Sequence, residues 1–109
     1  MSAIRTFTVT VVSTGGGNKY FIDGVQQDTV VLAEGYTYKF DVSDSSMGAH
    51  PFKFSTTSNG THSGGSEYTT GVTTSGTTGQ TNAYVEIAVA ASAPQLYYYC
   101  QYHSGMGGS

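Results

Sequence analysis

The sequence predicts an all-β fold with two sheets packed face to face, and both composition and periodicity favour this class. The 109 residues include 15 glycines and only two prolines, and 10% of the chain is charged. Together with many Thr, Val and Tyr residues, this composition is typical of short strands joined by turns. The stretch that looks most helical, residues 84–93, alternates with a period of two. A chain of this length buries one core, so we expect a single domain over residues 1–109.

Turns and alternating apolar residues divide the chain into about seven expected strands. Residues 15–18 form one turn, and Asp23-Gly24 is a candidate hairpin turn because this pair tolerates positive φ. The expected strands cover residues 4–13, 19–22, 30–33, 36–43, 51–56, 84–90 and 95–100. One face of these strands supplies the expected core, which comprises Phe7, Val9, Val11, Tyr36, Tyr38, Phe40, Val42, Phe52, Phe54, Val85, Ile87 and Val89.

Residues 55–82 have a different composition from the rest of the chain. They are mostly Ser, Thr and Gly, and Tyr68 and Val72 are their only large apolar side chains. A stretch of this length without strong structure is unusual inside a compact domain. We expect a long flap with one short strand near residues 67–72, and we expect His62 within it to be exposed to solvent.

The most informative residues stand near the end of the chain, where Cys100, His103 and Met106 are separated by two residues each. A mononuclear blue-copper site uses one thiolate and two imidazoles in a plane, with a weak axial thioether. One short loop can therefore present three of these groups, and His50 is the candidate for the fourth. Each residue also has a simpler interpretation. Cys100 can be an inert core thiol, His103 a surface side chain, Met106 a gap-filling residue, and His50 a buried neutral ring bonded to backbone.

This arrangement resembles the cupredoxin family, which includes plastocyanins, pseudoazurins and amicyanins. His50 is followed about fifty residues later by Cys-x-x-His-x-x-Met, and residues 30–42 resemble the family's strand, turn and strand before the first histidine. The likeness spans residues 28–106, and the Cys-to-Met spacing is that of amicyanins. The resemblance implies a Greek-key β-sandwich that binds type 1 copper as Cu(I)/Cu(II) through His50, Cys100, His103 and Met106.

Two departures from the family affect the expected site. Most relatives have, after the first histidine, a residue whose N–H bonds to the cysteine sulfur, whereas Pro51 has no N–H. The N–H of Tyr102 is then the candidate donor. Relatives also continue past the axial Met into a final strand, but here Ser109 follows three residues later. We therefore expect a missing last strand, a bare sheet edge and a weakly held Met106, unless a homodimer, a strand-supplying neighbour or a longer chain completes the edge.

Several side chains near the ligands have expected structural roles. Tyr98 should join the core on the side of Cys100, while Tyr97 and Tyr99 should face the other way. Met47 should pack or lie on the surface, and together with Ala49 and Pro51 it can form a small apolar rim for docking.

The resemblance implies one-electron transfer with a redox partner protein. The alternative is a structural or virion-associated β-sandwich with a stabilising or vestigial copper site, because the Thr/Ser/Gly-rich style resembles cupredoxin-like domains encoded with marine phage virion proteins. Copper storage is a third candidate, although it favours a more open site. We do not expect an enzyme, because a type 1 centre alone has no open coordination position.

Charge and hydropathy exclude other classes of partner. The net charge of -3 argues against a nucleic-acid surface, and no apolar run reaches the length of a membrane span. The first residues lead directly into a strand pattern without the features of a signal peptide, so the localisation stays open.

Overall fold

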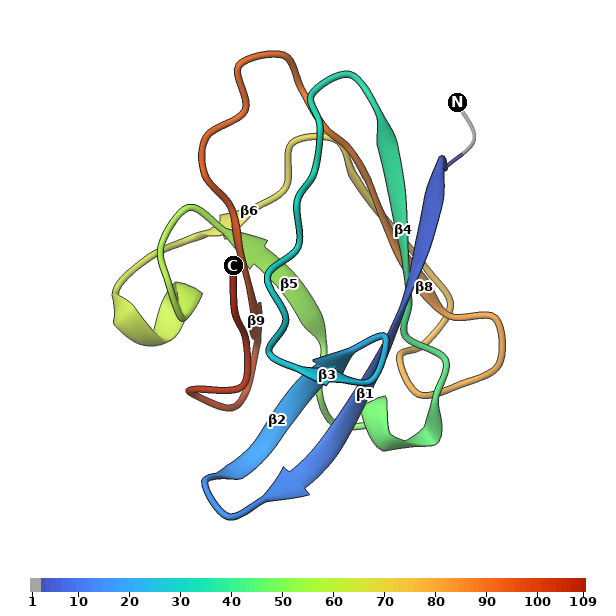
Figure 1. Ribbon diagram of the computed structural model, residues 1–109, viewed down its shortest axis with the longest axis vertical. Coiled ribbons are helices and arrows are strands. Elements are labelled where there is room, and N and C mark those ends of the chain that lie inside the picture. The colour runs from blue at the N-terminus through green and yellow to red at the C-terminus, as the bar shows by residue number, and fades with distance from the viewer. Residues whose placement is uncertain (1–2) are drawn as a thin grey trace.

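The computed structural model describes residues 3–109 as a two-sheet, all-β sandwich, which confirms the predicted fold class (Figure 1). Within these residues, one sheet has the strand order β3-β2-β1-β4-β8-β7 and the other has the order β6-β5-β9. The strands are β1 (Arg5–Thr14), β2 (Gly17–Ile22), β3 (Val25–Gln26), β4 (Thr37–Asp41), β5 (Phe52–Ser55), β6 (Glu67–Tyr68), β7 (Val72–Ser75), β8 (Tyr84–Ala88) and β9 (Tyr97–Cys100), with two short 3-10 helices, η1 (Ser45–Met47) and η2 (Gly60–Ser63).

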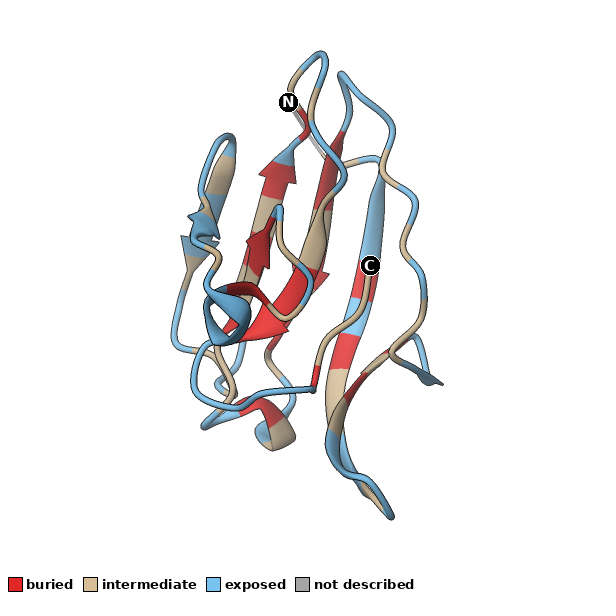
Figure 2. Ribbon diagram, turned by 90° about the vertical axis from the view of Figure 1, so that its left-hand side faces the viewer, coloured by how far each residue is buried: buried red, intermediate tan, exposed pale blue. Residues whose placement is uncertain are grey.

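Aromatic side chains hold the two sheets together. In the larger sheet, β1 runs parallel to β4, and the ring of Phe7 stacks on that of Phe40 with centroids 4.9 Å apart. The Phe40 ring also contacts Phe52 and Phe54 of the smaller sheet, at centroid distances of 5.0 and 5.4 Å. Buried residues accordingly lie on the strands between the two layers, whereas the hairpin tips are exposed (Figure 2).

Two predictions about the first half of the chain are wrong. Residues 30–33 form no strand: the N–H of Val30 donates to the Ser109 carbonyl in the tail, Val30 and Leu32 pack against the core, and Val31 is 82% exposed. Tyr36 is 49% exposed and is not a core residue. It lies between Gly35, whose φ is 82°, and the first residue of β4. Val11 is only partly buried.

Residues 55–82 are more ordered than the sequence predicts. The segment contains η2, then β6 paired with β5, then β7 paired with β8, so it crosses from the smaller sheet to the larger one. The single strand predicted near residues 67–72 thus corresponds to parts of two strands. Gly71 separates them with a φ of 71°, and a Cβ there would clash with the Ala88 carbonyl oxygen.

The edge of β9 is not bare, which corrects the prediction of an unprotected edge. Tyr98 and Gly108 form an antiparallel bridge with backbone hydrogen bonds of 2.9 and 3.1 Å. On the other side of this tail, the N–H of Val30 donates to the Ser109 carbonyl at 2.8 Å. A homodimer or a strand-supplying neighbour stays a prediction. Among residues 3–109, no helix is long and apolar enough to cross a membrane.

Replacing Gly107 by alanine is expected to lower the free energy of unfolding by about 1–3 kcal/mol, the usual range for overpacking. A Cβ at Gly107 would clash with the Tyr98 carbonyl oxygen and push the tail away from β9. Gly15→Ala is the matched control, since nothing lies within 4 Å of a Cβ at that position. Urea unfolding of both variants measures the difference, and equal stabilities would contradict the pairing of the tail with β9.

Candidate metal centre

Three metal-ligating atoms meet at one end of the sandwich. The Sγ atom of Cys100 lies 3.5 Å from the Nδ1 atom of His103 and 3.8 Å from that of His50, and the two Nδ1 atoms are 3.2 Å apart. Cys100 is the last residue of β9, His103 lies in the turn that follows, and His50 lies between η1 and β5. This group can hold a metal ion, as the sequence predicts.

The triangle has the size that a single ion requires. An ion at ordinary lengths of about 2.0–2.1 Å from imidazole nitrogen and about 2.3 Å from thiolate, centred in a plane, separates its ligands by roughly 3.5–3.8 Å. The three measured distances, 3.2, 3.5 and 3.8 Å, lie close to this range. Both rings present Nδ1 to the centre, so only a small closing or opening movement is needed to bind an ion.

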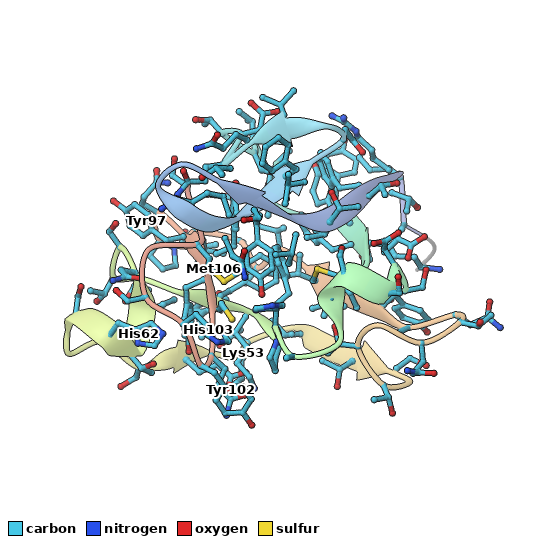
Figure 3. The ribbon with its side chains drawn as sticks, turned by 90° about the horizontal axis from the view of Figure 1, so that it is seen from below. Lys53, His62, Tyr97, Tyr102, His103 and Met106 are labelled. Atoms are coloured by element: carbon cyan, nitrogen blue, oxygen red, sulfur yellow. The ribbon has the colours of Figure 1, made fainter. Side chains whose placement is uncertain are left out.

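The three residues differ in their access to solvent. Cys100 is fully buried, His50 is partly buried and His103 is exposed. Burial, and then the neighbouring His103, lower the pKa of His50 below its ordinary value. A lowered pKa favours the neutral ring, which is the form that binds a metal. The exposed edge of the site is therefore the His103 ring (Figure 3).

Met106 completes the group and is firmly held, so the prediction of a weakly held Met106 is wrong. Its side chain is 1% exposed and belongs to the same core cluster as Cys100. Its loop is anchored by the β2–β3 hairpin. Lys19 Nζ donates to the Gly105 carbonyl at 2.9 Å, and Gln27 Nε2 donates to the carbonyls of Gly105 and Gly107 at 3.1 and 2.8 Å.

Tyr20, at the middle of β2, connects two of the candidate ligands. Its hydroxyl donates to the His50 carbonyl at 2.6 Å, and its backbone N–H donates to the Met106 carbonyl at 3.0 Å. Burial, and then the nearby Cys100, raise the pKa of the Tyr20 hydroxyl, which therefore stays protonated as a donor. Sequence reasoning missed Tyr20. The available signal was a tyrosine two residues from Ile22 on a buried strand face, because a buried Tyr O–H needs a partner.

The turn before His50 is stabilised by local hydrogen bonds. Asp44 Oδ2 accepts from the N–H of Ser46 at 3.0 Å, and the N–H of His50 donates to the Met47 carbonyl at 3.0 Å. Met47 is completely buried. The predicted packing role of Met47 is thus confirmed, but the predicted docking rim loses this member and keeps exposed Ala49 and half-buried Pro51.

The backbone around the sulfur differs from the prediction. In the described part of the chain, the hydrogen-bond partners of Cys100 Sγ are the two histidine rings, and the N–H of Tyr102 is not among them. Pro51 instead contributes its carbonyl, which accepts from the N–H of Gln101 at 3.1 Å. This bond ties the start of β5 to the first residue after the cysteine.

The tyrosines of β9 and His62 complete the surroundings. Tyr98 is buried in the core, as predicted, while Tyr99 faces the other way but is buried beneath η2, where a Cβ on Gly60 would lie 2.5 Å from its ring. His62 is exposed, as predicted, but it is not remote from the site. Its Nε2 lies 2.7 Å from the Cys100 carbonyl oxygen.

Comparison of the chain with protein-family models, curated proteins and solved structures finds no match. The assignment therefore depends on the fold and the site themselves. These define a two-sheet β protein with a His-Cys-His-Met group that can hold a metal ion and is compatible with a cupredoxin-like site.

Tyr20→Phe is expected to destabilise the protein by about 1–3 kcal/mol, because it leaves the His50 carbonyl without its donor. The substitution should also change the metal-bound visible spectrum, since the His50 segment loses its anchor. Tyr98→Phe is the matched control, because it removes a similar bond from a buried tyrosine to the Asp28 carbonyl, at 2.7 Å. Unfolding curves and metal-bound spectra of both variants provide the comparison. A spectral change as large in Tyr98→Phe as in Tyr20→Phe would refute a specific role for Tyr20.

Proposed function

We propose that the protein is a mononuclear type 1 copper protein that transfers single electrons. The observation that carries this proposal is the triangle of Cys100 Sγ and two histidine Nδ1 atoms, with Met106 buried beside it. One thiolate, two imidazoles and a thioether form the ligand set of blue-copper electron-transfer sites. The ligands are His50, Cys100, His103 and Met106.

The donor set supports copper over zinc. Structural zinc sites use four strong ligands in a tetrahedron, drawn from thiolate, imidazole and carboxylate groups. Here the fourth group is a thioether, which is a weak ligand, and in the described part of the chain no carboxylate joins the cluster. We propose no enzymatic activity, since the four residues leave no open position for a substrate.

The surrounding residues keep this geometry constant. Copper bound here supplies a Cu(I)/Cu(II) couple, and a low barrier for electron transfer requires ligands that move little between the two states. Tyr20 holds the segments of His50 and Met106, and the β2–β3 hairpin holds the loop on either side of Met106. The exposed ring of His103 gives a redox partner protein its closest approach.

Copper(II) added to the apoprotein is expected to produce an intense visible band from the thiolate, together with a reversible one-electron wave in voltammetry. Cys100→Ser should abolish the band, and His62→Ala should retain it, since His62 contacts Cys100 through the backbone carbonyl. An unchanged band in Cys100→Ser would show that Cys100 is not the thiolate ligand and would refute the proposed copper site. A band without a reversible wave would favour the alternative function, a structural or virion-associated domain with a stabilising or vestigial copper site.

Copper is also expected to raise the unfolding temperature. Ligand at about 100 times its dissociation constant contributes roughly 2.7 kcal/mol to stability. For a domain of this size, this corresponds to an increase on the order of 10–20 °C. Thermal unfolding with and without copper measures the shift, which His50→Ala should largely remove and His62→Ala should preserve. The opposite pattern would mean that His62, and not His50, is the upstream ligand.

A further inference from the structure

His62 provides a direct link between the candidate ligand cysteine and the protein surface. Its ring nitrogen Nε2 lies 2.7 Å from the carbonyl oxygen of Cys100, although 38 residues separate the two in the chain. The ring is exposed, whereas the cysteine is fully buried. His62 and His103, both labelled in Figure 3, each contact Cys100, but they come from different segments.

The position of His62 is set by packing. η2 begins at Gly60, which has a φ of 53° and no room for a side chain because the Tyr99 ring lies against it. The His62 ring meets the ring of Tyr99 edge-on, with centroids 6.2 Å apart. Nearby, Asn59 accepts from the N–H of Gly105 at 2.9 Å and donates to Ser104 at 2.8 Å. These contacts join η2 to the ligand loop.

The contact offers a short path for an electron. From the sulfur, the path follows the covalent bonds of Cys100 to its carbonyl, crosses one hydrogen bond and enters an aromatic ring at the surface. Tyr99, the residue before Cys100, provides no such path to the surface, because it is 1% exposed and lies beneath η2.

We infer that His62 is a second electron exit, separate from His103, where a one-electron acceptor docks; this inference rests on the proposed electron-transfer function. One electron leaves the reduced centre through Cys100 and His62 and reduces the acceptor by one electron. No bond forms or breaks, and no proton moves. On the smaller sheet, Lys53 of β5 and Glu67 of β6 form an ion pair at 3.1 Å and neutralise each other. The surface of this sheet near His62 therefore suits an acceptor without strong net charge.

A ruthenium pentaammine label tests this inference in the copper-loaded protein. The label attaches to the free ring nitrogen of His62, while copper occupies the other two histidines. The control is the double variant His62→Leu, Ser63→His, which moves the label to the next residue of η2 and removes the bond to Cys100. A flash-excited photoreductant in solution reduces the ruthenium(III) label to ruthenium(II), which then passes one electron to Cu(II) along the same path in reverse. This transfer is expected to be several-fold faster from His62 than from position 63, at equal driving force.

Two results would overturn the inference in distinguishable ways. Equal rates from the two labels, with the visible band and the copper potential intact, would reject His62 as an exit while leaving the electron-transfer function standing. A centre with no reversible one-electron couple would remove the proposed function and the exit together. A second control, His62→Leu with Thr61→His, places the label on the other side of position 62 if the first variant does not fold.

Discussion

The candidate site depends on one residue of the larger sheet that reaches two ligand segments at once. Tyr20 donates through its hydroxyl to the His50 carbonyl and through its backbone to the Met106 carbonyl. His50, Cys100 and His103 lie in or beside β5 and β9 of the smaller sheet, whereas Tyr20 lies in the larger one, so these two hydrogen bonds form only when the sheets are packed. The ring of Tyr20 contributes to this packing as well, since it contacts Phe52 and Tyr98 with centroids 5.3 and 6.3 Å away. Core packing and ligand geometry are therefore coupled. A substitution that disturbs the core should also shift the ligands, and a substitution at the ligands should also disturb the core.

This coupling has a consequence for metal binding. A site assembled only by the metal must order its loops when the ion arrives, and the entropy of that ordering weakens binding. Here the donor atoms of His50, Cys100 and His103 already lie within 4.8 Å of one another, and hydrogen bonds from Lys19 and Gln27 hold the loop of Met106. Most of the ordering cost is met during folding. The same restraint limits how far the ligands can move when the charge of the centre changes, which is the property that one-electron transfer needs.

The ligand group could be predicted from the sequence because most of its residues are close together along the chain. Three of the four residues lie within one loop, and period-two alternation was enough to place Tyr98 in the core and the β5 phenylalanines opposite β4. Prediction from the sequence failed where the structure of a segment depends on contacts with residues far away in the chain. Residues 30–33 have strand composition, but the N–H of Val30 donates to the Ser109 carbonyl in the tail and not to a neighbouring strand. Met106 was expected to be weakly held because no final strand follows it, and the sequence could not reveal that Lys19 and Gln27, some 80 residues upstream, anchor its loop. Neither Tyr20 nor His62 could be assigned without these long-range contacts.

The Ser/Thr/Gly-rich segment shows how a sequence with few apolar residues can still be structured around a site. Gly60 allows the Tyr99 ring to lie against the backbone, and the buried hydroxyl of Ser55 bonds to the Ser66 carbonyl at 2.7 Å. Small residues therefore allow side chains to approach the backbone closely, and their hydroxyl groups supply hydrogen bonds to buried backbone carbonyls. Larger apolar residues would instead fill the core. In this segment, Asn59 bonds to Gly105 of the ligand loop, and His62 contacts the Cys100 carbonyl. The surface around the centre is therefore shared by this segment and the ligand loop, which exposes Tyr102 beside His103.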